Sequence, residues 1–66
     1  MKIGFRMAFN TFYNIENGRC GMVFGYGSKK DMLELAQKQF DLPDNQTAWA
    51  KVIRNKDDAV VFELNR

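Results

Sequence analysis

Few side chains in this sequence are of a type that could catalyse a reaction or bind a metal. The 66 residues include no histidine and one cysteine, Cys20. Without an imidazole, the chain cannot build a histidine-based acid–base mechanism or the common zinc sites. We expect Cys20 to be an inert, buried thiol, because only distant carboxylates or lysines could act as its base. The sequence therefore predicts a protein that is not an enzyme and that uses no metal or cofactor.

The segment GYGSKK, residues 25–30, is the stretch that comes nearest to a phosphate-binding loop. The dinucleotide motif G-x-G-x-x-G begins with Gly25 and Gly27, but its third position is Lys30. Lys29 and Lys30 fall in the first turn of a predicted helix, where backbone N–H groups and the helix dipole favour anions. We favour two solvated lysines; the alternative is a contact with an anion or with an acidic partner.

The composition is that of one small globular domain spanning residues 1–66, with 45% hydrophobic and 27% charged residues. The net charge of +2 is too small to require a nucleic-acid or acidic-membrane partner. Basic residues nevertheless dominate the first thirty positions, which hold five basic side chains and one acidic. The longest apolar run, residues 59–62, is far too short to span a membrane. With no internal disulfide possible, we expect a cytoplasmic protein without a membrane partner.

A β-hairpin is predicted over the first 27 residues. Every second residue from Ile3 to Phe9 is hydrophobic, which is typical of a strand with one buried face. Asn17-Gly18 is typical of a two-residue type I′ turn. A turn there pairs Phe9 with Tyr26 and places the alternate residues of both strands, Cys20 among them, on the core face.

The same register predicts an exposed patch on the opposite face of this hairpin. Phe12 points outward across from Val23, and a glycine lies two residues to either side of Val23. One interpretation is structural, since an outward aromatic ring shields glycine backbone. The other is functional, since a flat patch with an aromatic anchor is typical of protein-binding sites. The candidate partner-binding residues are Arg6, Asn10, Phe12, Asn14 and Val23.

A helix and a second hairpin are predicted in the remaining sequence. The helix spans residues 28–40, SKKDMLELAQKQF, with Ser28 as N-cap and Asp31 three residues later. Its apolar residues share one face, which we expect to pack against a sheet. The hairpin consists of TAWAKVIRN (47–55) and AVVFELN (59–65).

Two registers of the second hairpin give Trp49 opposite environments. A four-residue NKDD loop pairs Trp49 with Leu64 and puts the indole in the core. A loop one residue longer or shorter pairs Ala50 with Phe62 and turns Trp49 outward. We favour the core position, because a small domain needs its largest apolar side chain inside.

The order hairpin, helix, hairpin predicts an α+β fold, a four-stranded, mostly antiparallel sheet with one helix packed on one face. This ββαββ layout resembles the β-grasp arrangement of small bacterial immunoglobulin-binding domains. The layout and the helical octet LELAQKQF (33–40) also resemble the phage-encoded inhibitor of bacterial RNA polymerase, and the size is similar to that of anti-CRISPR proteins. The resemblance implies a small phage or mobile-element inhibitor.

Two functions follow as hypotheses. The first is a protein-binding module, an inhibitor that docks through its sheet face on a larger host protein or nucleoprotein complex, as a monomer or small homo-oligomer. The alternative is a single-stranded nucleic-acid-binding domain that stacks bases on Phe12. Its basic residues would be Lys2, Arg6, Arg19, Lys29 and Lys30.

Overall fold

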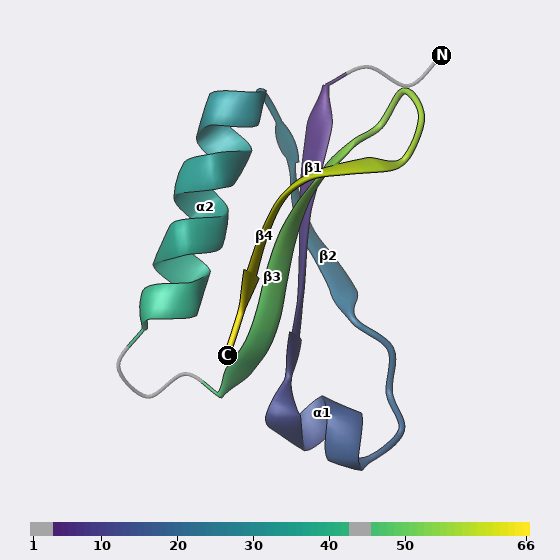
Figure 1. The fold of residues 1–66 in the computed structure, drawn as a ribbon, viewed down its shortest axis with the longest axis vertical. Helices are drawn as coiled ribbons and strands as arrows, with labels where there is room; N and C mark the ends of the chain where they lie inside the picture. Colours follow the sequence, from purple (N-terminus) through teal and green to yellow (C-terminus); the bar gives the residue numbers. More distant parts are fainter. Residues whose placement is uncertain (1–3, 43–45) are drawn as a thin grey trace.

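The computed structural model describes residues 4–42 and 46–66. In chain order its elements are β1 (Phe5–Thr11), α1 (Phe12–Glu16), β2 (Met22–Gly27), α2 (Lys29–Asp41), β3 (Thr47–Arg54) and β4 (Ala59–Asn65). The four strands form one sheet in the order β2-β1-β3-β4, and every pair is antiparallel. Helix α2 packs on one face of the sheet, and α1 lies beyond the end of β1 (Figure 1). The predicted α+β class is confirmed, and α1 is an additional short helix.

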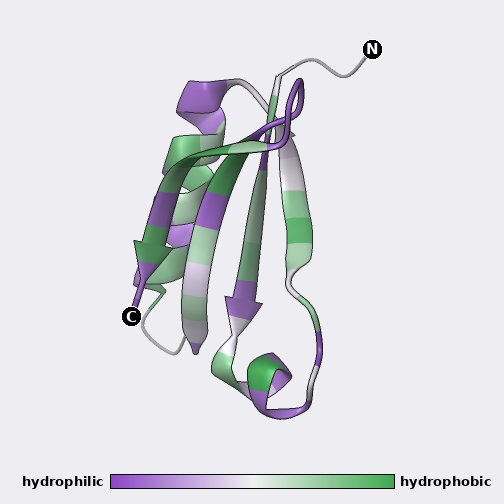
Figure 2. Ribbon diagram, turned by 45° about the vertical axis from the view of Figure 1, so that its right-hand side comes forward, coloured by the Kyte–Doolittle hydropathy of each residue, from purple (hydrophilic) through white to green (hydrophobic). Residues whose placement is uncertain are grey.

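The core lies between α2 and the two central strands, β1 and β3. Six buried hydrophobic side chains form it: Met7 and Phe9 from β1, Met32 and Ala36 from α2, and Ala50 and Val52 from β3. Ala36 and Ala50 are fully buried, and their small side chains allow the helix to approach the sheet closely. Figure 2 shows that hydrophobic residues also continue into β2, at the edge of the sheet.

Helix α2 begins where the sequence predicts. The Ser28 hydroxyl accepts a hydrogen bond from the backbone N–H of Asp31, at 3.1 Å, and so satisfies one of the free N–H groups of the first turn. Met32 and Ala36 are buried on the side that faces the sheet. The helix ends at Asp41, one residue beyond the predicted range.

The predicted turn at Asn17-Gly18 is wrong, because these residues end a helix rather than join two strands. Thr11 is the N-cap of α1, and its hydroxyl accepts a hydrogen bond from the N–H of Asn14 at 3.1 Å. Asn17 is the C-cap of α1, and Gly18 follows it with φ +69°. A left-handed glycine suits both a type I′ turn and the end of a helix, and the Thr11 cap favours the helix.

The pairing of β1 with β2 therefore differs from the predicted register. Tyr26, predicted to pair with Phe9, pairs with Arg6, and Val23 pairs with Ala8. The register shifts once along the pair, which is typical of a β-bulge. Because β2 starts only at residue 22, residues 19–21 take no part in the strand pairing of the sheet. Ile3, the first hydrophobic residue of the predicted strand, lies outside the described residues.

Two single-residue expectations are overturned by these registers. Cys20 is exposed in the loop before β2, so its predicted burial is wrong. Trp49 is half-buried on the face of the sheet opposite α2, so the favoured core position is wrong as well. The alternative register, with a loop one residue longer or shorter, placed Trp49 on the correct face of the sheet. Its pairing was wrong, however, because Ala50 pairs with Leu64 instead of Phe62. The register of this hairpin shifts between Val52 and Ile53, which is typical of a β-bulge. Residue pairs near the turn and those at the open end therefore follow different registers.

Candidate protein-binding surface

Arg6, a predicted partner-binding residue, is engaged within the domain. Its Nη1 donates to Asn55 Oδ1 at 2.8 Å, and its Nη2 donates to Asp58 Oδ1 at 2.9 Å. The Arg6 side chain is 19% exposed. Arg6 therefore fastens β1 to the turn between β3 and β4.

Asn10 and Asn14, also predicted to line a patch, hold the segment around α1 in place. Asn10 is 4% exposed, which contradicts its predicted outward position. Its Nδ2 donates to the carbonyl of Arg19 at 3.3 Å, and its Oδ1 accepts from the N–H of Thr11 at 2.9 Å. The Asn14 carbonyl accepts from the N–H of Arg19 at 2.8 Å. These polar groups satisfy backbone groups where the chain leaves β1 and returns toward β2.

Phe12 and Val23 are both exposed, but they do not face each other. Phe12 is the first residue of α1, and Val23 lies in β2 opposite Ala8. The predicted patch, with an aromatic ring between two glycines, does not form.

A side chain of the domain lies against each of the two glycines of that patch. A Cβ on Gly21 would lie 2.5 Å from Cη2 of Trp49, so the indole ring rests directly on Gly21. A Cβ on Gly25 would lie 2.9 Å from Cδ2 of Leu35, which belongs to α2. The ring that shields glycine backbone is thus Trp49, which lies on the Cβ side of Gly21; Gly21 itself remains exposed and Gly25 is half-buried.

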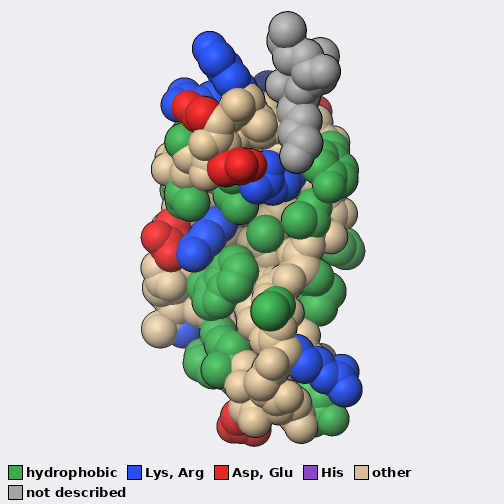
Figure 3. All heavy atoms as spheres, turned by 90° about the vertical axis from the view of Figure 1, so that its right-hand side faces the viewer, with side chains coloured by type: hydrophobic (Ala, Val, Ile, Leu, Met, Phe, Trp, Pro, Cys, Tyr) green, Lys and Arg blue, Asp and Glu red, His purple; other side chains and the backbone are tan. Residues whose placement is uncertain are grey.

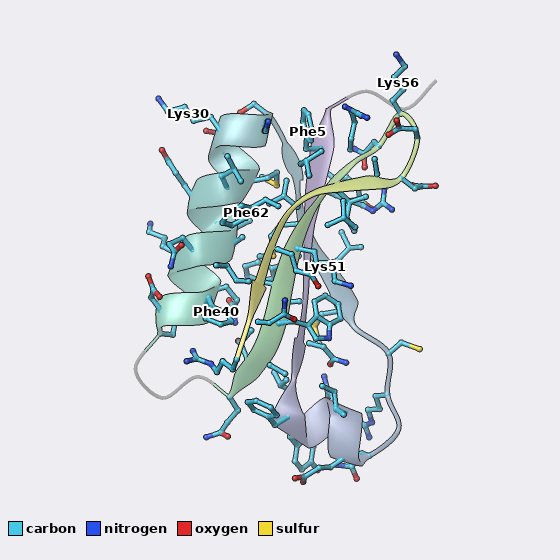
Figure 4. All side chains as sticks on the ribbon, viewed as in Figure 1. Phe5, Lys30, Phe40, Lys51, Lys56 and Phe62 are labelled. Atoms are coloured by element: carbon cyan, nitrogen blue, oxygen red, sulfur yellow. The ribbon has the colours of Figure 1, made fainter. Side chains whose placement is uncertain are left out.

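Charged side chains on the face opposite α2 are arranged in pairs of opposite sign. Lys51 Nζ lies 4.7 Å from the centroid of the Trp49 ring and 3.7 Å from Glu63 Oε2. In Figure 3, which views this side of the molecule, basic side chains lie next to acidic ones in the upper and middle parts, whereas a basic side chain at the lower right has no acidic neighbour. Figure 4 shows Lys51 on the side of the sheet away from α2. On the sheet itself, Arg6 and Lys51 are therefore each balanced by a carboxylate.

The exposed hydrophobic side chains are concentrated in α1 and β2. Among the described residues, nine large hydrophobic side chains are exposed, and seven of them belong to these two elements. We call them the β2–α1 surface: Phe12, Tyr13, Ile15, Met22, Val23, Phe24 and Tyr26. They follow one edge of the sheet and the adjoining end of the molecule (Figures 1 and 2). Tyr26 is the most exposed of them, at 71%.

Sequence reasoning missed most of this surface because the predicted register placed its residues in the core. Tyr13 and Ile15 would have continued the buried face of β1, whereas they lie in α1. One signal in the sequence does indicate exposure. The run Met22-Val23-Phe24 is hydrophobic at consecutive positions, so one side of the strand must carry apolar groups away from the core.

Lys29 and Lys30 are exposed at the start of α2. Neither takes part in a salt bridge among the described residues, and Lys30 points away from the sheet (Figure 4). The preference for solvated lysines over a contact with an anion or an acidic partner stays a prediction.

The turn between β3 and β4 contains a carboxyl group with a shifted pKa. Hydrogen bonds from Arg54, from Nε to Oδ1 at 3.0 Å and from Nη2 to Oδ2 at 2.8 Å, hold Asp57 in a two-point contact. They lower the pKa of Asp57 from 3.8 to about 2. The group is an ion-pair partner in a turn and remains charged at neutral pH.

Within the described part of the chain, no group of three or more acidic or cysteine side chains is arranged to hold a metal ion. Nor does any helix in residues 4–42 and 46–66 have the length and apolar character needed to cross a membrane. The chain matches no protein-family model, no curated protein and no solved structure. The role of the β2–α1 surface must therefore be inferred from its own residues.

Proposed function

We propose that this protein is a non-enzymatic binding module that docks on a larger protein, or on a nucleoprotein complex, through its β2–α1 surface. The proposal is carried by one observation, the concentration of seven of the nine exposed large hydrophobic side chains in α1 and β2. Exposed apolar groups that lie together, rather than singly, mark interaction sites. The small size of the domain and the absence of histidine favour an inhibitor that acts by occupying a surface of its partner.

The residue types of this surface suit docking. Tyrosine and phenylalanine are large and rigid, and they are enriched among the residues that contribute most to protein interfaces. A side chain of this size contributes about 1.5–3 kcal/mol when it becomes fully buried. Because these side chains are only 40–71% exposed in the free domain, four of them contribute about half of that amount, about 3–6 kcal/mol in total, against a cost of association of about 4–15 kcal/mol. A stable complex thus requires several residues of the surface at once, including members of both α1 and β2.

The proposed site keeps two of the five predicted partner-binding residues. Phe12 and Val23 belong to the β2–α1 surface. The side chains of Arg6 and Asn10 are engaged in hydrogen bonds within the domain, and half-buried Asn14, whose backbone carbonyl accepts from Arg19, is not one of the exposed hydrophobic residues that define the surface.

Binding of single-stranded nucleic acid is the weaker candidate. Such proteins combine exposed aromatic rings with a basic groove that follows the phosphates. The sheet face offers no such groove, because Arg6 and Lys51 are paired with Asp58 and Glu63. Lys2, another of the predicted basic contacts, lies outside the described residues. We expect no binding of labelled oligonucleotides even at low salt, where phosphate contacts are strongest.

Two valines provide a matched test of the docking surface. Val23 in β2 is 46% exposed and Val60 in β4 is 50% exposed, and the two lie at opposite edges of the sheet. Tagged wild-type protein, the Val23→Glu variant and the Val60→Glu variant would be used to capture binding proteins from a cell lysate. A glutamate on the surface of either edge strand perturbs the fold to a similar extent, so thermal melts should agree between the variants.

We expect Val23→Glu to lose the captured partner and Val60→Glu to retain it. Retention of the partner by Val23→Glu, with an unchanged thermal melt, would exclude β2 from the docking surface. Equal loss from both variants would show that the effect is not specific to this surface.

A further inference from the structure

Strand β2 is an edge strand that lacks the charged residues and the proline that often protect an edge, although it carries a β-bulge at Phe24. The strand order leaves the outer side of β2 unpaired among the described strands. Its six residues, MVFGYG, include no charged residue and no proline. Edge strands are commonly protected by such residues, because their free N–H and C=O groups can pair with another chain. The other edge strand, β4, carries Glu63.

Hydrophobic side chains of β2 are exposed on both faces of the sheet. Val23 and Tyr26 lie on the face away from the core, as their pairing with β1 shows. Met22 pairs with the core residue Phe9 and lies on the side of α2. The Phe24 ring meets the Phe9 ring edge to face, with a centroid distance of 5.6 Å, and is still 54% exposed. A strand that is apolar on both faces is typical of the interior of a sheet, with a neighbour on each side.

The space beside β2 is open to such a neighbour. Helix α2 packs mainly on the central strands β1 and β3, and it does not cover the outer edge of β2 (Figure 1). An added strand would satisfy the free backbone groups of β2 and would also cover its exposed side chains.

The charges near the ends of β2 indicate the chemistry of that strand. The nearest charged residue before β2 is Arg19 and the nearest after it is Lys29, and both are exposed. The hydrogen bond from Asn10 to the carbonyl of Arg19 fixes this end beside β1. Two β2 strands from two copies would bring Arg19 toward Lys29 if antiparallel, or toward the other Arg19 if parallel. Both arrangements place like charges together, whereas a strand with acidic ends is complementary.

We propose that β2 accepts an extended segment of the partner protein as a fifth strand, and that this segment is hydrophobic in its middle and acidic at both ends. The inference rests on the proposed function, and it specifies how the β2–α1 surface binds. Main-chain hydrogen bonds hold the segment, Val23 and Tyr26 contact it on one face, and its carboxylates lie near Arg19 and Lys29.

The probes are three blocked nonapeptides, added to the ¹⁵N-labelled full chain and followed by NMR. The first, DEVTVTVED, has the proposed chemistry. The second, KKVTVTVKK, keeps the middle and reverses the charge at the ends. The third has the first sequence with N-methyl groups on its three valines. These groups replace the backbone N–H donors along one edge of the peptide.

We expect the acidic peptide to shift the amide resonances of residues 22–27 and to slow their hydrogen exchange. The dissociation constant of the lysine peptide should be larger by a factor of about ten or more, since a loss of about 1.4 kcal/mol of charge interaction corresponds to a factor of ten. The N-methylated peptide should not bind. Val23→Glu should abolish the shifts and Val60→Glu should leave them unchanged.

Shifts confined to residues outside 19–29, no shifts at millimolar acidic peptide, or equal binding of the acidic and lysine peptides would overturn the proposal. A dimer in sedimentation experiments, with β2 resonances that depend on protein concentration, would overturn it in favour of a second copy. If Val23→Glu loses partner capture while the acidic peptide leaves β2 unchanged, the docking surface stands and strand addition fails. If Val23→Glu retains capture, the proposed function itself fails.

Discussion

Alanine at position 21 should force the ring of Trp49 away from the sheet. A Cβ on Gly21 would lie 2.5 Å from Cη2 and 2.7 Å from Cζ2 of Trp49, and 3.2 Å from the carbonyl oxygen of Phe9. Non-bonded carbon atoms rest about 3.5–4.0 Å apart, so the ring must move by about 1 Å or more. Because the indole is rigid, the movement has to occur at its side-chain torsions or in the loop before β2.

The cost of this displacement follows from the overpacking of a closely fitted site. Insertion of a methyl group into such a site destabilises a protein by about 1–3 kcal/mol. In a domain of this size, each kcal/mol lowers the Tm by about 4–8 °C. The displaced ring also loses part of its contact with Lys51, whose Nζ lies 4.7 Å from the ring centroid.

Fluorescence measures both effects, because Trp49 is the only tryptophan in the chain. We expect Gly21→Ala to shift the Trp49 emission to longer wavelength, as the ring gains contact with water, and to lower the urea midpoint. The control is the same substitution in a Trp49→Ala background, followed by circular dichroism. In that background the loss of unfolding free energy caused by Gly21→Ala should be within about 0.5 kcal/mol of zero, because the ring that the new methyl group would displace is absent. Equal destabilisation in both backgrounds would refute the packing of Trp49 on Gly21.

Three further predictions concern the contacts that hold the fold around the site. Because the pKa of Asp57 is lowered from 3.8 to about 2, its ion pair stabilises the fold fully above about pH 3.8 and loses this contribution as the pH falls toward 2. Thermal melts should therefore show a smaller acid-dependent loss in Asp57→Asn than in the wild type, and parallel curves would contradict this. Arg66 stacks on Phe40 at 4.2 Å and donates to the Phe40 carbonyl, so Arg66→Ala should cost about 1–2 kcal/mol in urea unfolding. Thr11→Ala should cost about 1 kcal/mol by the same measurement, whereas Thr11→Ser, which keeps the capping oxygen, should cost much less.

The elements whose sequence signals lie in residues close together in the chain could be predicted from the sequence. The Ser28 cap and the periodicity that follows it gave the start of α2, because both signals act within one or two turns. The α+β class followed from the number and order of such segments. Asn17-Gly18 failed as a local signal because positive φ at glycine is compatible with two structures, and the decision depended on the Thr11 cap.

Register and the candidate site depended on residues far apart in the chain. The register shifts in the β1–β2 and β3–β4 pairs changed which residues pair, and no feature of the hydrophobic alternation marks their positions. Arg6 is paired with Asp58, 52 positions away, so its engagement was not visible in the sequence. The same holds for Trp49, whose packing on Gly21 depends on how β3 lies beside β1. Phe12 and Val23 were placed at the surface, but from a register that the structure replaces.

Docking through the β2–α1 surface is tested most directly by hydrogen–deuterium exchange mass spectrometry on the captured complex and on the free protein. We expect amides of residues 12–27 to exchange more slowly in the complex, and those on the outer side of α2 to be unchanged. Slower exchange confined to α2 or β4, with residues 12–27 unchanged, would contradict docking through this surface.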